Sequence, residues 1–122
     1  MNTRFGIAIV SMLLLLFSKS ATATQSHVTL TPEQHKELIV FGMRAMGARV
    51  TPSDVKNPLT REKVEALVAT GLNLNGHLCA EMVDLRPIQL KSKYEATCIT
   101  YRGGSATTTY IIDALQGVAF EQ

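Results

Sequence analysis

The sequence is short of the residues on which several protein classes depend. Its 122 residues include only two cysteines and no tryptophan, and 6% are aromatic. Two cysteines exclude a cysteine-dense toxin scaffold, and eight glycines exclude a collagen-like repeat. Charged residues make up 18% of the chain against 46% hydrophobic residues, which excludes a disordered tail. The length fits one domain.

Long hydrophobic runs are also scarce, and the one present lies near the N-terminus. Residues 5–17 are interrupted only by Gly6 and Ser11. A single run excludes a multi-span membrane protein, and this run is shorter than the about 20 apolar residues of a transmembrane helix. A basic residue precedes it and the small-residue stretch 21–23 follows, as in a secretory signal peptide. We therefore predict a signal peptide over residues 1–23, a flexible leader over 24–30 and a single domain over 31–122.

Cleavage of the signal peptide changes the charge of the protein. It removes Arg4 and Lys19 and no acidic residue, so ten basic and ten acidic residues remain and the net charge falls from +2 to zero. Basic residues are scattered without forming a stripe, so we expect no nucleic-acid partner. We expect an exported protein, periplasmic or secreted, with no stable membrane insertion after cleavage. The alternative is a retained N-terminal anchor.

Two amphipathic helices are predicted in the first half of the domain. The first runs from an N-cap at Thr31 to a stop at Gly47, and the second from an N-cap at Thr60 to a stop at Gly71. Residues 51–54 between them predict a turn or one short helical turn.

The pattern after residue 76 is extended and rich in β-branched residues. Residues 78–86, 94–101 and 106–113 are predicted as strands, followed by a short tail over 118–120. Short connections make neighbouring strands antiparallel. We therefore predict an α+β fold with two N-terminal helices packed on a three- to four-stranded antiparallel β-meander. The expected core comprises Leu38, Met43, Val64, Leu67, Val83, Ile99 and Ile111.

The two cysteines lie in the part of the chain that we expect to be exported. Cys79 falls at the start of the first predicted strand and Cys98 falls in the second, so antiparallel pairing brings them roughly opposite each other. Oxidising compartments favour pairing, and we predict a Cys79–Cys98 disulfide. A thiol-dependent enzyme is the alternative, because His77 and Cys79 share one face of a strand and could act as base and nucleophile.

The three histidines do not form a metal motif. His27 falls in the leader, His35 on the first helical turn and His77 before the first strand, without the spacing of a zinc site. No glycine-rich phosphate loop is present either. We therefore expect neither a metal nor another cofactor.

Two further candidates for catalysis fail on their pattern. Ser105 lacks the Gly-x-Ser-x-Gly order of a nucleophile elbow, and a strand follows it where that motif needs a helix. Glu81 and Asp84 differ by three positions on a predicted strand, so we expect their carboxylates to face opposite sides. We assign no catalytic residue.

Two segments near the C-terminus resemble the PepSY family. Residues 94–99 have the sequence Tyr-Glu-Ala-Thr-Cys-Ile, and residues 110–118 have Tyr-Ile-Ile-Asp-Ala-Leu-Gln-Gly-Val. PepSY domains have an extended Tyr-Glu-Val strand before a strand that ends in Asp-Ala-x-x-Gly-x-Val. The resemblance covers the C-terminal third. It implies a helix ahead of an antiparallel sheet, a secreted or periplasmic protein, and a binding or protease-inhibitory module.

These observations favour a small exported binding module, either inhibitory or accessory to an envelope protein, whose partner is another protein. The alternatives come from two other classes. One is the thiol-dependent enzyme that uses Cys79 with His77, and the other is a secreted effector.

Overall fold

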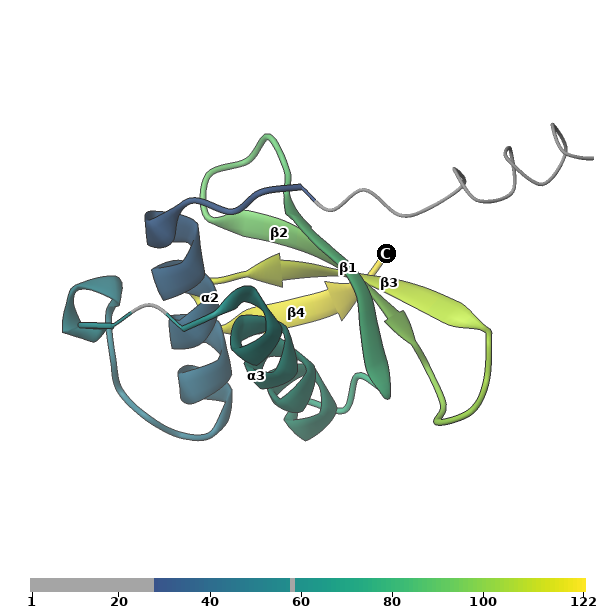
Figure 1. Cartoon of the computed structure of the whole chain (residues 1–122). Helices are drawn as coiled ribbons and strands as arrows, with labels where there is room; N and C mark the ends of the chain where they lie inside the picture. Colours follow the sequence, from purple (N-terminus) through teal and green to yellow (C-terminus); the bar gives the residue numbers. More distant parts are fainter. Residues whose placement is uncertain (1–27, 58) are drawn as a thin grey trace, which may run out of the picture.

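Two helices precede a four-stranded sheet in the computed structural model of the chain, which describes residues 28–57 and 59–122 (Figure 1). The predicted signal peptide lies outside the described residues. No helix in the described ranges is both long and apolar enough to cross a membrane. In chain order the elements are α2 (Pro32–Ala45), η1 (Pro52–Asp54), α3 (Arg61–Leu74), β1 (Glu81–Pro87), β2 (Lys93–Ile99), β3 (Thr107–Asp113) and β4 (Val118–Glu121).

The first helix begins as predicted, with a complete capping box. The Thr31 hydroxyl accepts a hydrogen bond from the Gln34 N–H at 3.1 Å, and the Gln34 side-chain oxygen accepts from the Thr31 N–H at 2.9 Å. These bonds satisfy two of the free donors at the helix start. The predicted short turn over residues 51–54 is the 3-10 helix η1.

The second helix has its predicted N-cap, Thr60, but it does not end at Gly71. It continues to Leu74. The predicted stop at Gly71 was wrong. This glycine lies inside the helix, where its missing side chain lets α2 and α3 approach each other. A Cβ there would lie 3.1 Å from the Phe41 ring and 3.3 Å from the Gly42 Cα, so the two helices cross closely at this pair of glycines.

The sheet is an antiparallel meander in the order β1-β2-β3-β4. The short C-terminal segment after Gly117 forms the fourth strand, pairing with β3. Both helices lie over one face of the sheet (Figure 1), and their buried side chains join those of the sheet in one core. The predicted α+β class with two helices before an antiparallel sheet is therefore confirmed.

The core contains only part of the predicted set. Leu38 and Val64 are fully buried, whereas Met43 and Leu67 are half-buried and pack against the core. Val83 is half-buried and is not part of the core. The helices therefore behave largely as predicted, and the differences lie in the strands.

In β2 and β3 the face toward the helices is the opposite of the predicted one. The buried side chains there are Tyr94, Ala96, Cys98, Tyr110 and Ile112. Because side chains alternate along a strand, the predicted core residues of these two strands lie on the open face. Both faces carry apolar or β-branched residues, so the alternation in the sequence did not distinguish them. Ile99 and Ile111, which we predicted to be core residues, are half-buried on the open face instead.

The first strand begins later than predicted and contains a bulge. It starts at Glu81, and the register shifts between Met82 and Asp84. Glu81 pairs with Ile99 and Asp84 pairs with Thr97, so the two carboxylates share the open face. The prediction that they face opposite sides was wrong, because a bulge adds one residue and reverses the alternation.

The start of the described chain is held against the domain. Leu30 is buried, and the Val28 carbonyl accepts a hydrogen bond from the Arg61 guanidinium at 2.6 Å. The same guanidinium donates to the Leu85 carbonyl on β1 at 2.7 Å. Residues 28–30 of the expected leader are therefore tied to α3 and β1, and residues 24–27 lie outside the described residues.

Candidate binding site beside the disulfide

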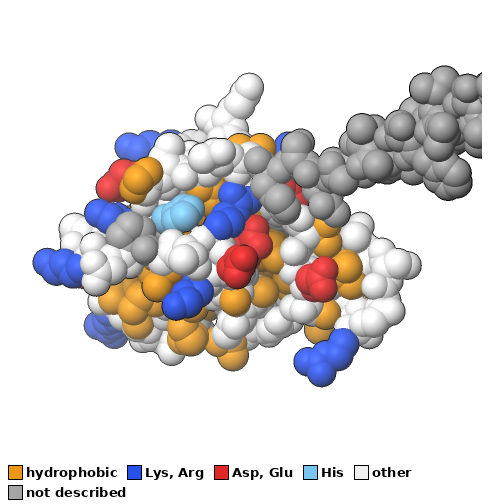
Figure 2. All heavy atoms as spheres, in the orientation of Figure 1, with side chains coloured by type: hydrophobic (Ala, Val, Ile, Leu, Met, Phe, Trp, Pro, Cys, Tyr) orange, Lys and Arg blue, Asp and Glu red, His pale blue; other side chains and the backbone are white. Residues whose placement is uncertain are grey.

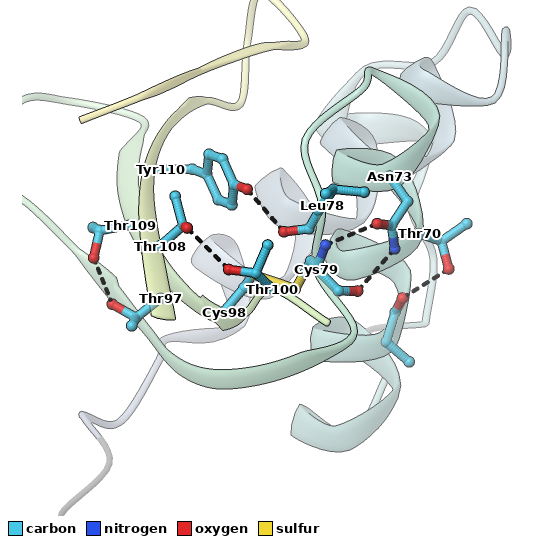
Figure 3. Close-up of a disulfide and its surroundings, with 11 residues drawn as sticks. Thr70, Asn73, Leu78, Cys79, Thr97, Cys98, Thr100, Thr108, Thr109 and Tyr110 are labelled. Atoms are coloured by element: carbon cyan, nitrogen blue, oxygen red, sulfur yellow. Dashed lines mark hydrogen bonds between the residues drawn. A yellow bond between two sulfur atoms is a disulfide. The ribbon is translucent and has the colours of Figure 1, made fainter. Parts of the chain in front are cut away.

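The sulfur atoms of Cys79 and Cys98 lie at disulfide-bond distance, with the Cα atoms 5.1 Å apart (Figure 3). Both side chains are buried. Cys98 lies on β2, but Cys79 precedes β1 in the segment that connects α3 to the sheet. The disulfide therefore anchors this connecting segment to the middle of the meander.

Hydrogen bonds fix the same connecting segment from both sides. Figure 3 shows the Asn73 amide of α3 directed at the Cys79 backbone, where it donates to the carbonyl and accepts from the N–H, both at 2.8 Å. On the sheet side, the Tyr110 hydroxyl donates to the Leu78 carbonyl at 2.8 Å. The His77 Nε2 lies 2.9 Å from the Ala119 carbonyl on β4. Residues 77–79 are thus held by side chains from both layers.

The structure does not bring His77 and Cys79 together as a base and a nucleophile. The Cys79 sulfur is buried and paired with Cys98. The imidazole of His77 instead packs at a tilt against the Tyr110 ring, with centroids 5.1 Å apart, and bonds to a β4 carbonyl. Cys79 would have to be reduced before it could act as a thiolate.

A hollow of about 390 Å³ lies between the segment that connects α3 to β1 and the connection between β2 and β3. Thr100, Thr108 and Tyr110 line it from the sheet, and the Thr100 and Thr108 hydroxyls are 3.0 Å apart. Two apolar side chains on its lining are exposed, Tyr101 at 65% and Leu78 at 46%. Its size is that of a small-ligand site.

The electrostatics of this hollow are set by Glu121, which is the acidic residue of its lining. Burial raises the pKa of the Tyr110 phenol, and the negative charge of Glu121 raises it further. The phenol therefore stays protonated and continues to donate to Leu78.

A second polar cluster joins α2 to the β1–β2 connection. Both oxygens of the Glu37 carboxylate accept hydrogen bonds, one from the Tyr94 hydroxyl at 2.6 Å and one from the Ser92 hydroxyl at 2.8 Å. Ser92 has a φ of 59°, which places it in the left-handed region. Burial raises the pKa of Tyr94 well above the usual tyrosine range, and the bond to Glu37 adds to this. The cluster ties the hairpin to the helix.

The residues that carry the PepSY resemblance build the turn between β3 and β4. The Asp113 carboxylate accepts from the Gln116 N–H and from the Lys93 ammonium, both at 3.1 Å. Burial raises the pKa of Asp113, but these two bonds outweigh it, so its pKa lies below the usual value. Gly117 has a φ of 73°, which suits glycine. These residues have a structural role in the turn.

The other residues considered from the sequence are placed apart from the hollow. His35 lies near the start of α2, and its Nδ1 is 3.1 Å from the Leu59 carbonyl. Ser105 is exposed on the β2–β3 connection, and His27 lies outside the described residues. Within residues 28–57 and 59–122, no three His, Cys, Asp or Glu side chains gather at a geometry that could hold a metal ion.

Both edge strands of the sheet have a backbone carbonyl occupied by a side chain from elsewhere. Arg61 bonds to Leu85 on β1, and His77 bonds to Ala119 on β4. An occupied carbonyl cannot pair with a further strand at that position.

Sequence reasoning missed most residues of this hollow. Tyr101 was assigned to the end of a predicted strand, and the side-chain bonds of Asn73 and Tyr110 join residues from different elements. One signal was available. Tyr101 is an aromatic residue next to the polar turn 102–105, where a buried ring is not expected.

Comparison with known proteins gives no match to a family model, to a curated protein or to a solved structure.

Proposed function

We propose that the protein is a small exported binding module that engages another protein through the hollow beside the disulfide. It would act as an inhibitor or as an accessory to an envelope protein. The signal-peptide pattern of residues 1–23 supports export, as does a cysteine pair at disulfide distance. The PepSY resemblance supports a binding role.

The observation that carries the proposal is that one wall of the hollow, residues 77–79, is held in place by several contacts. Residues 77–79 are held by a disulfide, by side chains from α3 and β3, and by the bond of the His77 ring to a backbone carbonyl of β4. A wall that is already ordered loses little conformational entropy when a partner binds. Next to it, the exposed Tyr101 ring offers the kind of side chain that often dominates the energy of protein interfaces.

The test is capture of partners from an envelope extract with the exported protein and two variants. Tyr101→Ala removes the exposed ring of the hollow. Leu90→Ala is the matched control, because Leu90 is 60% exposed but lies on the β1–β2 connection. We expect a partner that is retained by the wild type and Leu90→Ala and lost by Tyr101→Ala. Equal capture by all three proteins would contradict a role for the hollow.

A further inference from the structure

The side chains that line the hollow offer mostly acceptors for hydrogen bonds. The Tyr110 proton is already given to the Leu78 carbonyl, so its oxygen is left to accept. A carbonyl only accepts, so the His77 Nε2 donates its proton to Ala119 and is not free to donate to a ligand. Thr100 and Thr108 share one hydrogen bond, which leaves one hydroxyl proton to donate.

Backbone donors at the hollow are also largely used. The Gly76 N–H bonds to the Asn73 carbonyl at 3.1 Å, and the His77 N–H bonds to the Leu72 carbonyl at 2.8 Å. The Thr100 N–H bonds to the Ala106 carbonyl at 3.0 Å. A ligand that supplies donors of its own would therefore match the acceptors of the hollow.

The charge of the lining is negative. Glu121 belongs to the lining, and no lysine or arginine does. Arg102 and Glu81 line a neighbouring hollow of about 190 Å³, which Tyr101 also borders. Glu121 is the charged residue of the larger hollow itself, so its carboxylate sets the sign of the charge that a ligand meets there.

The exposed apolar side chains suit the stem of a long basic side chain. Tyr101 presents a ring whose face attracts a cation, and Leu78 offers an aliphatic contact. Arginine and lysine combine a donor-rich cationic head with methylene groups that pack on such surfaces.

We infer that the hollow binds a basic side chain, arginine or lysine, of the partner protein, with its cationic head at Glu121 and its stem between Tyr101 and Leu78. The inference rests on the proposed function and specifies which part of the partner the module recognises. Arginine fits better than lysine, because its five N–H donors match several acceptors at once.

The test is a titration of the exported protein followed by ¹H–¹⁵N correlation spectra. The probe is N-acetyl-arginine N-methylamide, and its citrulline counterpart has nearly the same shape without the charge. We expect the arginine probe to shift the amide signals of residues 76–78, 100–101 and 108–110. The citrulline probe should bind at least about tenfold more weakly, because it lacks the charge that faces the carboxylate. Spermidine is a third probe. It distinguishes recognition of an amino-acid side chain from binding of any free amine.

Variants assign the effect to the hollow. Glu121→Gln should weaken binding of the arginine probe by about threefold to tenfold while the dispersion of the spectrum shows an intact fold. Glu62→Gln on the exposed part of α3 is the matched control and should leave binding unchanged. Tyr101→Leu keeps bulk but removes the ring, and it should also weaken binding.

Three results would overturn the inference. They are equal binding of the citrulline probe, binding of spermidine without binding of the arginine probe, or no binding of any probe. None of these affects the proposed function itself, which fails only if Tyr101→Ala retains the captured partner.

Discussion

Glu37 shows how a single residue connects the two layers of this protein. It lies on α2, yet both of its carboxylate oxygens accept bonds from the start of the second strand region, from Ser92 and Tyr94. Hydrogen bonds to a charged acceptor are worth more than neutral ones, about 1.5–3 kcal/mol each. Glu37 is half-buried, so its contribution depends on the Tyr94 hydroxyl keeping the proton that it donates.

Tyr94→Phe tests this dependence through pH. The raised pKa of Tyr94 means that the folded protein keeps a proton which the unfolded chain releases near pH 10. The stabilisation is therefore complete below pH 10 and is lost as the pH rises above it. Urea unfolding at pH 8 and pH 11 should show a stability difference between wild type and Tyr94→Phe that shrinks at the higher pH. Tyr101→Phe, whose ring is exposed, should keep the wild-type pH dependence.

Asn73→Ala tests the two hydrogen bonds that hold the Cys79 backbone to α3. The substitution leaves the N–H and the carbonyl of Cys79 without their partners at a buried position. We expect a loss of about 1–3 kcal/mol in unfolding free energy. Asn75→Ala, at the exposed C-cap of the same helix, should change stability by less than about 0.5 kcal/mol. Equal losses of unfolding free energy for Asn73→Ala and Asn75→Ala, measured by chemical unfolding, would show that the two hydrogen bonds of Asn73 contribute nothing specific.

At the scale of elements, the contact between the two helices depends on a pair of glycines. Glycine inside a helix costs about 1 kcal/mol relative to alanine. Here that cost is offset by the close approach of α2 and α3, since Gly42 faces Leu67 and Gly71 faces Phe41. A residue that looks like a helix stop in the sequence is therefore a packing residue in the fold.

Alanine substitution at the two glycines should have unequal effects. A Cβ on Gly42 would overlap the Leu67 side chain and lie 3.0 Å from its carbonyl oxygen, so we expect Gly42→Ala to destabilise by about 1–3 kcal/mol. The contacts of a Cβ on Gly71 start at 3.1 Å, so Gly71→Ala should cost less. Thermal unfolding of both variants measures the order. A larger loss for Gly71→Ala would contradict this description of the crossing.

At the scale of the whole molecule, charges of both signs lie close together on the face of the described residues that Figure 2 draws. Figure 2 shows acidic, basic and hydrophobic side chains interspersed over the face that carries the helices. Met46 and Leu74, near the ends of α2 and α3, are among the exposed apolar residues.

Reduction of the disulfide should destabilise the whole domain. The cysteines are 19 positions apart, and closing a loop of this length stabilises a fold by about 3 kcal/mol in the chain-entropy description. We expect a clearly lower melting temperature for the reduced protein and for the double variant Cys79→Ser/Cys98→Ser. Thiol titration of exported protein should find no free thiol. Two free thiols under non-reducing conditions would contradict the pairing and favour the thiol-dependent enzyme.

Export is the prediction that concerns residues 1–23. Intact mass of the protein recovered outside the cytoplasm should show a new N-terminus near Thr24. A charged residue in place of Leu14 should block export, because placing an ion in the apolar run is costly. Exported protein that retains Met1 would favour the anchored alternative.

The sequence alone determined much of the local structure. The Thr31 capping box, the Thr60 cap and the turn over residues 51–54 follow from interactions within a few residues. Cys79 and Cys98 could also be paired from the sequence, because there were only two cysteines and the order of the strands brought them together.

Only the tertiary structure decided which face of each strand packs on the helices and what the connecting segment does. Both faces of β2 were compatible with burial, and the packing of Tyr94, Ala96 and Cys98 in the core with the helices distinguishes them. The bulge in β1 reversed the expected orientation of Glu81 and Asp84. The hollow at Tyr101 is lined by residues from two connections and two strands, β3 and β4, and contacts between distant residues leave no periodic signal in a single sequence.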